Sequence, residues 1–360
     1  MYSINMGPGC FNQNSAEVLM NTDTEESFQN LKQWGLNTHS FLSLYPNVEH
    51  FRIEGVQGYI PYAETEHLIL VAGEPIASPE ALRPLVNGIL KMSLQRGKRL
   101  GMIPCRATNK EFLLSLGFDA VYIGKEPIFD LQHLPKLPKS IRQAVNRAQR
   151  RGIKVVEYDE SYKSALEKLS SRWQDTREVP ALQFLFQLRP LELHEHKKLF
   201  LAVDAHGELR AFLSCSPIYG RNGWYLEDLI RDDCAPNGTS ELLLTRAMEK
   251  LAEEGFELAT LALAPLAGLP DIDENHPWVN RILRLAYTRL SWAYHFQTLE
   301  FFKSKFKPSY WEQNYFYFYP AGVDLGLVKN LLEAFLGTSL FAIVTHKVKR
   351  MLPASKQDVA

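Results

Sequence analysis

Apolar and polar positions follow two different spacings along this chain, which predicts a mixture of helices and strands. Residues 50–76 form three short stretches separated by glycine and charged breaks, so they predict three short strands. Apolar residues three or four positions apart predict a helix over 24–35, closed by Gly35, and a second helix that begins at Ser78-Pro79-Glu80. The residues up to 21 carry little pattern and predict a loose arm.

The predicted elements occur in the same order twice. Residues 68–104 and residues 226–263 each read as a strand, a short loop, a helix and a second strand, and each copy is followed by another helix and strand. The last strand, over 309–320, is rich in aromatic residues and is typical of either an edge strand or a core strand. The sequence therefore predicts an α/β protein with two tandem domains joined by a basic helix. The predicted segments are an N-terminal arm with a short helix (1–35), a first domain (36–135), the connecting helix (136–157), a second domain (158–320) and a C-terminal helix and tail (321–360).

The stretch over 224–241 holds the candidate chemistry. It predicts a strand that ends with Glu227, Asp228 and Arg231, followed by a turn and a helix whose N-cap is Thr239 or Ser240. Open α/β sheets bind ligands at the carboxyl ends of their strands, and a helix start favours anionic groups. Asp228 and Arg231 are therefore candidates for a reacting centre beside an anion site. The alternative is an ordinary ion pair at a sheet edge. Because strand neighbours alternate, Glu227 is expected on the face opposite Asp228.

Composition narrows the class of protein. Among 360 residues, 40 Lys+Arg balance 41 Asp+Glu, so any nucleic acid or membrane would be attracted by local patches and not by net charge. The four cysteines form no CxxC pair, which indicates reduced thiols. There is no secretory signal and no apolar run of membrane-spanning length, so we expect a soluble protein. His194-Glu195-His196 lacks a third ligand at usable spacing, and no metal site is expected.

A basic segment separates the two copies of the repeat. Residues 131–156 contain seven Lys or Arg residues and no acid, and residues 140–151 predict a helix whose apolar stripe is Ile141, Val145 and Ala148. A run of charge is usually a solvated helix face. In a chain of nearly zero net charge, however, a one-sided bias also favours contact with a phosphate backbone. The sequence leaves both interpretations open.

The repeated unit resembles the GNAT acyltransferase fold, in which an acyl donor is bound between splayed strands beside a helix N-terminus. Members that use acetyl-CoA carry an Arg/Gln-x-x-Gly-x-Gly/Ala phosphate loop. The two helix starts of this chain read ASPEAL and PNGTSELL instead. The resemblance therefore implies neither CoA nor any other cofactor.

Several short motifs, taken in order over about residues 36–320, resemble the C-terminal domain of the aminoacyl-phosphatidylglycerol synthases. The motifs are Gly55–Gly58, Gly73–Pro75, Ser140–Ala148, Asp228–Arg231, Ala235–Gly238, Ala264–Leu266, and Phe302–Pro308 with Trp311. The resemblance implies two GNAT-like domains flanking a basic helix, an aminoacyl-tRNA donor and an anionic membrane lipid whose hydroxyl is the acceptor. It also implies that Asp228 and Arg231 are needed for transfer.

On this interpretation each candidate residue has a role. Asp228 would handle the acceptor hydroxyl as a base or orienting group, and Arg231 would bind a phosphate through its planar fork. The residues assigned to the substrates are Glu227, Asn237, Gly238, Glu241, Lys303 and Lys305. The residues assigned to tRNA are Arg142, Arg147, Arg150 and Arg151.

The chain also departs from the family. We expect no integral-membrane flippase of the kind that usually precedes this domain, and Gln313-Asn314 replaces the Pro-Arg that often follows the Trp-Glu of the last strand. The expected location is the cytoplasm, with residues 325–350 read either as an interfacial helix at the inner face of the cell membrane or as a helix packed on the second domain. Two other functions stay open: an aminoacyl-tRNA-dependent transferase that acts on a peptide or cell-wall amine, and a non-catalytic tRNA- or membrane-binding protein.

Overall fold

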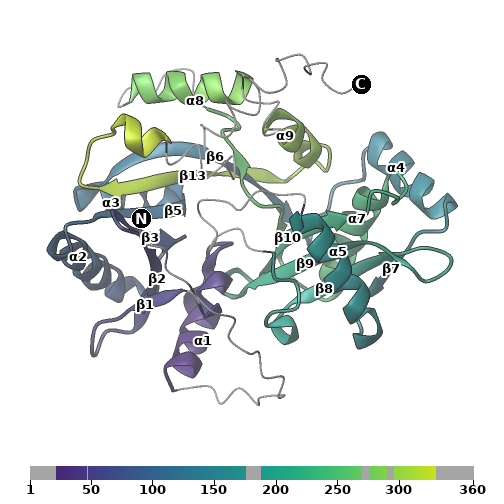
Figure 1. Cartoon of the computed structure of the whole chain (residues 1–360), viewed down its shortest axis with the longest axis horizontal. Coiled ribbons are helices and arrows are strands. Elements are labelled where there is room, and N and C mark those ends of the chain that lie inside the picture. Colours follow the sequence, from purple (N-terminus) through teal and green to yellow (C-terminus); the bar gives the residue numbers. More distant parts are fainter. Residues whose placement is uncertain (1–21, 47, 176–187, 270–275, 290–295, 330–360) are drawn as a thin grey trace, which may run out of the picture.

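One continuous sheet runs through the molecule (Figure 1). The computed structural model describes residues 22–46, 48–175, 188–269, 276–289 and 296–329. Within them the sheet has 13 strands, in the order β1-β2-β3-β5-β13-β6-β11-β10-β9-β8-β7, with β4 paired to β2 and β12 paired to β6. Helices cover both faces, so the predicted α/β class is confirmed.

The strands are β1 (Glu49–Phe51), β2 (Gly58–Glu64), β3 (Leu68–Ala72), β4 (Ile76–Ala77), β5 (Arg99–Arg106), β6 (Asp119–Asp130), β7 (Lys154–Glu157), β8 (Lys198–Val203), β9 (Leu209–Ile218), β10 (Gly223–Arg231), β11 (Leu258–Thr260), β12 (Ala264–Pro265) and β13 (Tyr310–Tyr319). The helices are α1 (Thr22–Trp34), α2 (Pro79–Gln95), α3 (Lys110–Ser115), α4 (Lys139–Arg150), α5 (Lys163–Asp175), α7 (Thr239–Glu253), α8 (Pro277–Arg289) and α9 (Phe296–Ser304). Short 3-10 turns are η1 (Ser40–Leu44), η2 (Ala107–Asn109), η3 (Glu160–Tyr162), η4 (His194–His196) and η5 (Tyr219–Arg221).

The repeat predicted from the order of elements is present in the strand pairing. In the first half, β2 pairs antiparallel with β3, and β3 pairs parallel with β5 across the α2 connection. In the second half, β9 pairs antiparallel with β10, and β10 pairs parallel with β11 across the α7 connection. Each half is therefore the same unit of two antiparallel strands, a helix and a parallel strand.

The two halves exchange their last strands. β13, the last strand of the second half, lies between β5 and β6 and pairs antiparallel with both. β6, the last strand of the first half, pairs antiparallel with β11 of the second half. Of the two alternatives left open for the aromatic strand, the structure selects a core position, since β13 has a neighbour on each side. The predicted domain boundaries stay predictions, because neither half completes its sheet with its own strands alone.

Alternation along the strands of the first half explains the helices on its two faces. Ile69 and Val71 face a cluster formed with the apolar side of α2, while Leu70 and Ala72 face a cluster formed with η1 and α8. Burial on both faces accounts for the almost uninterrupted apolar run of β3. Figure 1 shows α8 running above β13 and β6.

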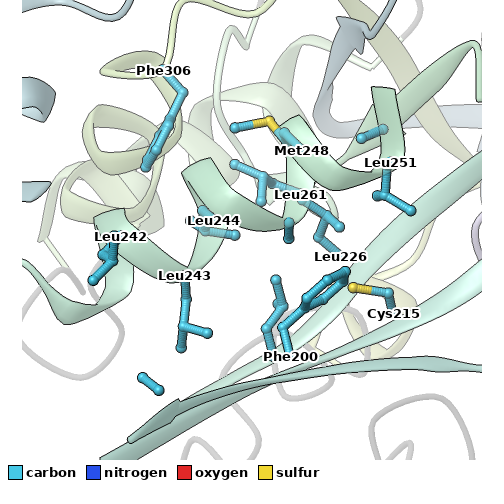
Figure 2. Packing of buried hydrophobic residues seen from close by; sticks show 14 of the residues in the cluster. Phe200, Cys215, Leu226, Leu242, Leu243, Leu244, Met248, Leu251, Leu261 and Phe306 are labelled. Atoms are coloured by element: carbon cyan, nitrogen blue, oxygen red, sulfur yellow. The ribbon is translucent and has the colours of Figure 1, made fainter. Parts of the chain in front are cut away.

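α7 anchors the second half. Leu242, Leu243 and Leu244 are all buried, because α7 packs against both the sheet and α4 (Figure 2). Residues of β8, β9 and β10 complete this cluster, among them Phe200, Cys215 and Leu226. Truncating a leucine in such a core typically lowers the free energy of unfolding by about 2–5 kcal/mol. The helix that follows the candidate loop is therefore held rigidly.

The predicted basic helix is confirmed as α4. Its apolar stripe Ile141, Val145 and Ala148 is buried against the α7 core, as predicted. Gly238 explains how closely the two helices approach, because a Cβ atom at this position would lie 2.1 Å from the carbonyl oxygen of Ala144. Gly238 also has a φ of +101°, which side chains disfavour. A glycine is therefore required where the candidate loop touches α4.

Candidate active site

The candidate acids lie where the second half of the sheet opens. β10 and β11 pair only from Gly223 to Tyr225, which lie opposite Leu258 to Thr260. Beyond that point β10 continues to Arg231 with β9 as its neighbour. The residues Leu226 to Arg231 therefore line the position where the two parallel strands part, at the carboxyl end of β10. This is the sheet position at which open α/β folds bind ligands.

A β-bulge in β10 brings the two carboxylates to one face. Leu226 pairs with Cys215 and Asp228 pairs with Ser214, so Glu227 is the extra residue. The expectation that Glu227 faces away from Asp228 is wrong, because the bulge interrupts the alternation on which it depended. The Ser216 hydroxyl donates a 2.5 Å hydrogen bond to Glu227 Oε2, on the same side of β9 as Ser214.

Asp228 and Arg231 point to opposite faces of the sheet. Past the bulge, Asp228, Leu229, Ile230 and Arg231 pair one by one with residues 214 to 211 of β9. Ile230 packs in the cluster formed with α5, whereas Leu229 packs in the cluster formed with α7. Because strand residues alternate, Asp228 lies on the face covered by α5, with Ile230, and exposed Arg231 lies on the face covered by α7, with Leu229. The prediction that this acid and base form one reacting centre or one ion pair is wrong in its geometry.

A buried lysine that sequence reasoning missed faces the acids. Lys197 lies directly before β8, and its side chain is only 1% exposed. Its Nζ lies 3.7 Å from Glu227 Oε2 and donates hydrogen bonds to the Tyr45 hydroxyl (2.7 Å) and to the Arg189 carbonyl oxygen (3.0 Å). Tyr45 follows η1 in the first half of the chain. The described site therefore combines residues from both halves.

Burial dominates the electrostatics of this cluster. Burial raises the pKa of the Asp228 carboxyl well above its ordinary value, the Glu227 carboxylate raises it further, and Lys197 opposes both. Burial also raises the pKa of the Tyr45 hydroxyl, helped by Glu227 and Asp228. Tyr45 therefore keeps its own proton while it accepts the hydrogen bond from Lys197. Asp228, when ionised, is a stronger base than an exposed aspartate.

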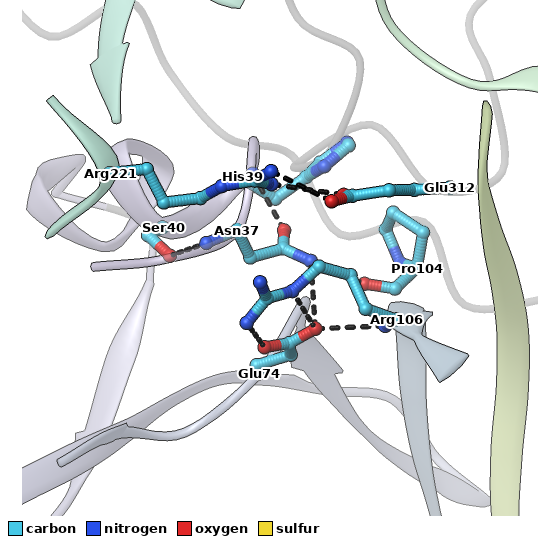
Figure 3. A network of polar contacts seen from close by, with 8 residues as sticks. All are labelled: Asn37, His39, Ser40, Glu74, Pro104, Arg106, Arg221 and Glu312. Carbon is cyan, nitrogen blue, oxygen red and sulfur yellow. Dashed lines mark hydrogen bonds and ion pairs between the residues drawn. The ribbon is translucent and has the colours of Figure 1, made fainter. Parts of the chain in front are cut away.

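A second polar network lies at the matching position of the first half (Figure 3). Arg106 at the end of β5 donates hydrogen bonds of 2.9 Å and 2.8 Å to the two carboxylate oxygens of Glu74, which follows β3. Asn37 accepts from the His39 backbone N–H (2.8 Å) and donates to the Pro104 carbonyl oxygen (3.0 Å). In the first half, the nearly buried Arg106–Glu74 ion pair therefore fills the place at the carboxyl ends of the parallel strands β3 and β5.

His39 brings the network of the first half next to β10. Its ring lies 6.1 Å from the ring of Tyr225 in β10, and burial lowers its pKa to about 4, so the imidazole is neutral. No sequence signal identified His39, Tyr45 or Lys197. The one hint for Lys197 is a lysine directly before an apolar strand, and such lysines are usually exposed.

Lys303 and Glu126 are buried charges close to the same opening. Lys303 Nζ donates to the carbonyl oxygens of Ala262 (3.0 Å) and Leu263 (2.8 Å), the residues at which the chain leaves β11. Burial lowers the pKa of Lys303 to about 7 and raises that of Glu126 to about 7, although Thr260 donates a 2.7 Å hydrogen bond to Glu126. Lys303 therefore holds the backbone at the opening.

Arg221 is held beside this pair by Glu312. Glu312 lies opposite Glu126 on the neighbouring strand β13. Arg221 of η5 donates hydrogen bonds of 2.9 Å and 2.7 Å to the two carboxylate oxygens of Glu312 (Figure 3). The bidentate pair fixes the guanidinium where the two halves of the molecule meet.

The geometry invites a comparison with known proteins. The family described as "Phosphatidylglycerol lysyltransferase, C-terminal" matches residues 28–318. The chain belongs to this family. The matched residues include β10, Lys197 and Tyr45. The mixed sheet with GNAT-like units is the fold that the sequence predicted.

Relatives of the phosphatidylglycerol lysyltransferase C-terminal family agree with this assignment. The phosphatidylglycerol lysyltransferase of Bacillus subtilis is 22% identical over 301 residues, which is 81% of this chain and 35% of that protein. A lysylphosphatidylglycerol biosynthesis bifunctional protein of Nocardia farcinica is 25% identical over 203 residues, 54% of this chain and 18% of its own length. The chain thus spans about a third or less of the curated relatives it matches.

Solved structures share the fold. The structure of L-PGS from Bacillus licheniformis has a TM-score of 0.72 at 18% identity and covers 89% of this chain and 99% of its own. The C-terminal domain of a protein from Agrobacterium fabrum, named for lysylphosphatidylglycerol synthetase, has a TM-score of 0.71 at 16% identity, with 94% and 99% covered. FemX has a TM-score of 0.54 at 10% identity, with 87% and 99% covered.

The remaining predicted substrate residues of the loop lie at the start of α7. Gly238, and not Thr239 or Ser240, is the N-cap of α7, and the Thr239 hydroxyl donates instead to the Pro236 carbonyl oxygen (2.7 Å). The predicted cap residues are therefore wrong. Exposed Asn237 precedes Gly238, and Glu241 lies in the first turn of α7.

The two predicted lysines are also apart. Lys303 points inward, as described above. The ammonium group of Lys305 lies over the rings of Phe301 and Phe302, at 5.2 Å and 5.8 Å from their centroids. The two lysines assigned to the substrates therefore do not form one cationic site.

The four predicted tRNA residues lie together on α4 and its C-terminal cap. Arg142, Arg147, Arg150 and Arg151 are all exposed. An open hollow of about 530 Å³ is lined by Gln143, Asn146, Arg147, Arg150 and Arg151. Figure 1 shows α4 at the outer end of the second half, away from α8. A polyanion that binds α4 would therefore approach the molecule from a different side than a ligand that contacts α8.

Two absences apply to the residues described above. Among them, no group of three or more histidine, cysteine, aspartate or glutamate side chains is arranged to hold a metal ion. His194–His196 forms the short turn η4. None of the described helices is both long and apolar enough to cross a bilayer. The N-terminal arm and most of the tail, on which further predictions depended, lie outside the described residues.

Proposed function

We propose that this protein transfers an aminoacyl group from aminoacyl-tRNA to a hydroxyl of an anionic membrane lipid, with phosphatidylglycerol as the acceptor. The observation that carries the proposal is the family match over residues 28–318. The names of the relatives supply the acceptor, since they refer to phosphatidylglycerol. The donor comes from the resemblance of the sequence motifs to the aminoacyl-phosphatidylglycerol synthases.

The chemistry of this transfer fits the cluster on β10. An aminoacyl ester is already activated, so transfer needs positioning, removal of the alcohol proton and stabilisation of the developing oxyanion. In the proposed mechanism, Asp228 accepts the proton of the lipid hydroxyl as that oxygen attacks the ester carbonyl. The ester bond to the tRNA ribose then breaks, and the departing ribose oxygen takes the proton back from Asp228, which leaves a free ribose hydroxyl and an ionised Asp228. The raised pKa of Asp228 favours the first step.

Glu227 and Lys197 act on Asp228 from the same face. Lys197 keeps a positive charge 3.7 Å from Glu227, and Tyr45 fixes the ammonium group. Removing this charge would leave Glu227 unbalanced and would raise the pKa of Asp228 further. These residues therefore set the pH range in which Asp228 works, and they are positioning residues.

Arg231 has a separate role in this proposal. It lies on the opposite face of β10 from Asp228, is exposed and precedes the loop into α7. A planar guanidinium at this place suits a phosphate of the lipid or of tRNA. The arginines of α4 are proposed to bind the tRNA backbone. The working position is then the inner face of the cell membrane, with peripheral contact.

Lipid profiling tests the proposal in cells. Lipids from cells with the protein, without it, and with Asp228→Asn are compared by mass spectrometry. The proposal predicts an aminoacylated phosphatidylglycerol that is present only with the unchanged protein. An unchanged lipid profile together with a modified peptide or cell-wall amine would replace the lipid acceptor with an amine.

A further inference from the structure

An apolar stripe lies on the outward face of α8. Trp278 and Leu285 are seven residues, or two helical turns, apart, so they lie on one side of the helix, and Ile282 between them is half-buried against the inward cluster. Trp278 is 38% exposed and Leu285 is 57% exposed, while Val279, Leu283 and Ala286 on the inward side are buried. The apolar face of α8 is therefore wider than the part that the described residues cover, and Trp278 and Leu285 form its exposed margin.

Two more exposed apolar side chains lie close to this stripe. Phe301 of α9 is 64% exposed, and Leu325 in the helical residues 325–329 is 71% exposed. The Tyr287 hydroxyl of α8 donates a 2.6 Å hydrogen bond to Glu300 of α9, which joins the two helices. The residues beside Leu325, Leu327 and Val328, pack in the same cluster as the inward side of α8. Figure 1 shows α8 and α9 on the same side of the molecule.

This side gathers half of the exposed large apolar residues of the described chain. The others are Leu36, Leu94, Leu114 and Tyr310. Leu94 and Leu114 lie near the ends of α2 and α3, on the opposite face of the sheet. Scattered exposed apolar residues are ordinary, but a group of them on one side marks an interaction surface.

Among the described residues, the charges on α8 itself and beside Phe301 are positive. α8 contains three arginines and no acid, and Arg281 is exposed beside the stripe. The Lys305 ammonium group lies 5.2 Å from the centre of the Phe301 ring. The nearby acids are occupied, because Glu300 pairs with Lys125 (2.8 Å) and Asp324 pairs with Arg99 (2.8 Å). Apolar and aromatic side chains flanked by cations complement the headgroup region of an anionic bilayer.

We propose that the outward side of α8, with Phe301 and Leu325, is the surface by which this protein docks on an anionic membrane. The proposal rests on the proposed lipid acceptor. It assigns the membrane contact mainly to α8 and α9, and Leu325 is the one residue that it shares with the predicted interfacial segment 325–350. α9 connects the surface to the candidate site, since Phe301 points outward while Lys303, two residues later, holds the backbone beside the opening of the sheet.

Vesicle binding tests the surface without any tRNA. The full chain and the triple variant Trp278→Ser, Leu285→Ser and Phe301→Ser are sedimented with vesicles of phosphatidylglycerol and phosphatidylcholine, and with phosphatidylcholine alone. The matched control, Leu94→Ser with Leu114→Ser, removes exposed apolar residues from the other face. We expect the affinity of the triple variant for the mixed vesicles to fall by about tenfold or more, while the control variant binds like the unchanged chain. Equal loss in the control, or no loss in the triple variant, overturns the proposal.

Two further measurements separate the other outcomes. Circular dichroism and the melting temperature check that each variant is folded, and sedimentation velocity reports its oligomeric state. A triple variant that dissociates from a dimer and still binds vesicles would show that the face covers a second copy, which overturns membrane docking.

Transfer to a short-chain, water-soluble phosphatidylglycerol separates this inference from the proposed function. If the unchanged chain aminoacylates that acceptor and does not bind vesicles, docking fails and the proposed function stands. If it binds vesicles through α8 and transfers nothing to either acceptor, docking stands and the proposed function fails.

Discussion

The ammonium group of Lys197 and the hydroxyl of Tyr45 form a 2.7 Å hydrogen bond between the two halves of the molecule. Lys197 precedes β8 in the second half, and Tyr45 follows η1 in the first half. The same ammonium lies 3.7 Å from Glu227 on β10. One buried cation therefore ties the first half of the chain to the acidic cluster of the second.

Replacing Lys197 with Met tests this connection. The variant leaves the largely buried Glu227 carboxylate without its counter-charge, a change that typically costs about 3–5 kcal/mol of unfolding free energy. The pKa of Asp228 should also rise, since Lys197 lowers it. Thermal unfolding and the pH dependence of transfer measure the two effects.

Lys198→Met is the matched control. Lys198 is the next residue, and it pairs with Glu254 at the surface (2.7 Å). A surface pair contributes about 0–1 kcal/mol, so stability and pH profile should hardly change. Equal effects of the two variants would remove Lys197 from the proposed mechanism.

Asp228→Asn tests the base itself. It keeps the size of the side chain and removes the charge, so single-turnover transfer should fall by about 10²-fold or more. Because the pKa of Asp228 is raised, the unchanged chain should lose activity on the acidic side at a pH above the ordinary aspartate range, and the variant should lack this limb. Asp233→Asn, at an exposed position in the following loop, is the control. Full activity of a folded Asp228→Asn protein would exclude the proposed role.

Arg231→Lys separates the two faces of β10. Lysine keeps the charge and loses the bidentate fork, so the apparent KM for the lipid or the tRNA should rise. Since Arg231 lies on the face away from Asp228, the acidic limb of the pH profile should stay where it is. A shifted limb would show that the two residues act together, against the geometry of β10.

The basic helix predicts a salt-dependent tRNA affinity. Changing Arg142, Arg147, Arg150 and Arg151 to Gln should weaken tRNA binding and lower the slope of log K against log salt by about 0.7–0.9 for each phosphate that α4 no longer neutralises. Lys163→Gln with Lys168→Gln, on the exposed side of α5, is the control for charge alone. The tRNA affinity is measured at several salt concentrations. An unchanged slope would reject the tRNA contact and show that the arginines of α4 form only a solvated helix face.

Glu126 predicts a pH dependence of stability. Its pKa rises from 4.5 to about 7 on folding, so between these values the folded chain holds more protons than the unfolded chain. Glu126 therefore contributes about 3 kcal/mol to the free energy of unfolding below pH 4.5, and this contribution is lost as the pH rises through 7. Glu126→Gln should flatten that decline in thermal melts. Exposed Glu111→Gln should not, and an equal slope in Glu126→Gln would refute the role of the buried charge.

Patterns that depend on local spacing were predictable from the sequence. The buried stripe Ile141, Val145 and Ala148 identified α4, and the repeated order of elements identified the two strand–helix–strand units. The bulge at Glu227 was not predictable, because it depends on register with β9 and not on any turn residue. It reversed the expected side of Glu227, and with the strand geometry it separated Asp228 from Arg231.

Long-range pairing explains the other differences. β13 looked like the end of its own domain, yet it completes the sheet of the first half, since β5 and β6 leave a place between them. Tyr45 and Lys197 lie 152 residues apart, and nothing in either local sequence indicates their contact. Such contacts follow from how the two halves dock, which residue spacing does not encode.

The most direct test of the proposed function is single-turnover transfer with purified components. The full chain is mixed with phosphatidylglycerol vesicles and, in turn, with tRNAs that carry labelled amino acids, lysine first because the relatives are named for lysyl transfer. We expect label in the lipid phase as an aminoacyl ester of phosphatidylglycerol with at least one donor, and its loss with Asp228→Asn. No labelled lipid with any aminoacyl-tRNA, in a folded chain that binds both vesicles and tRNA, would contradict the proposed function.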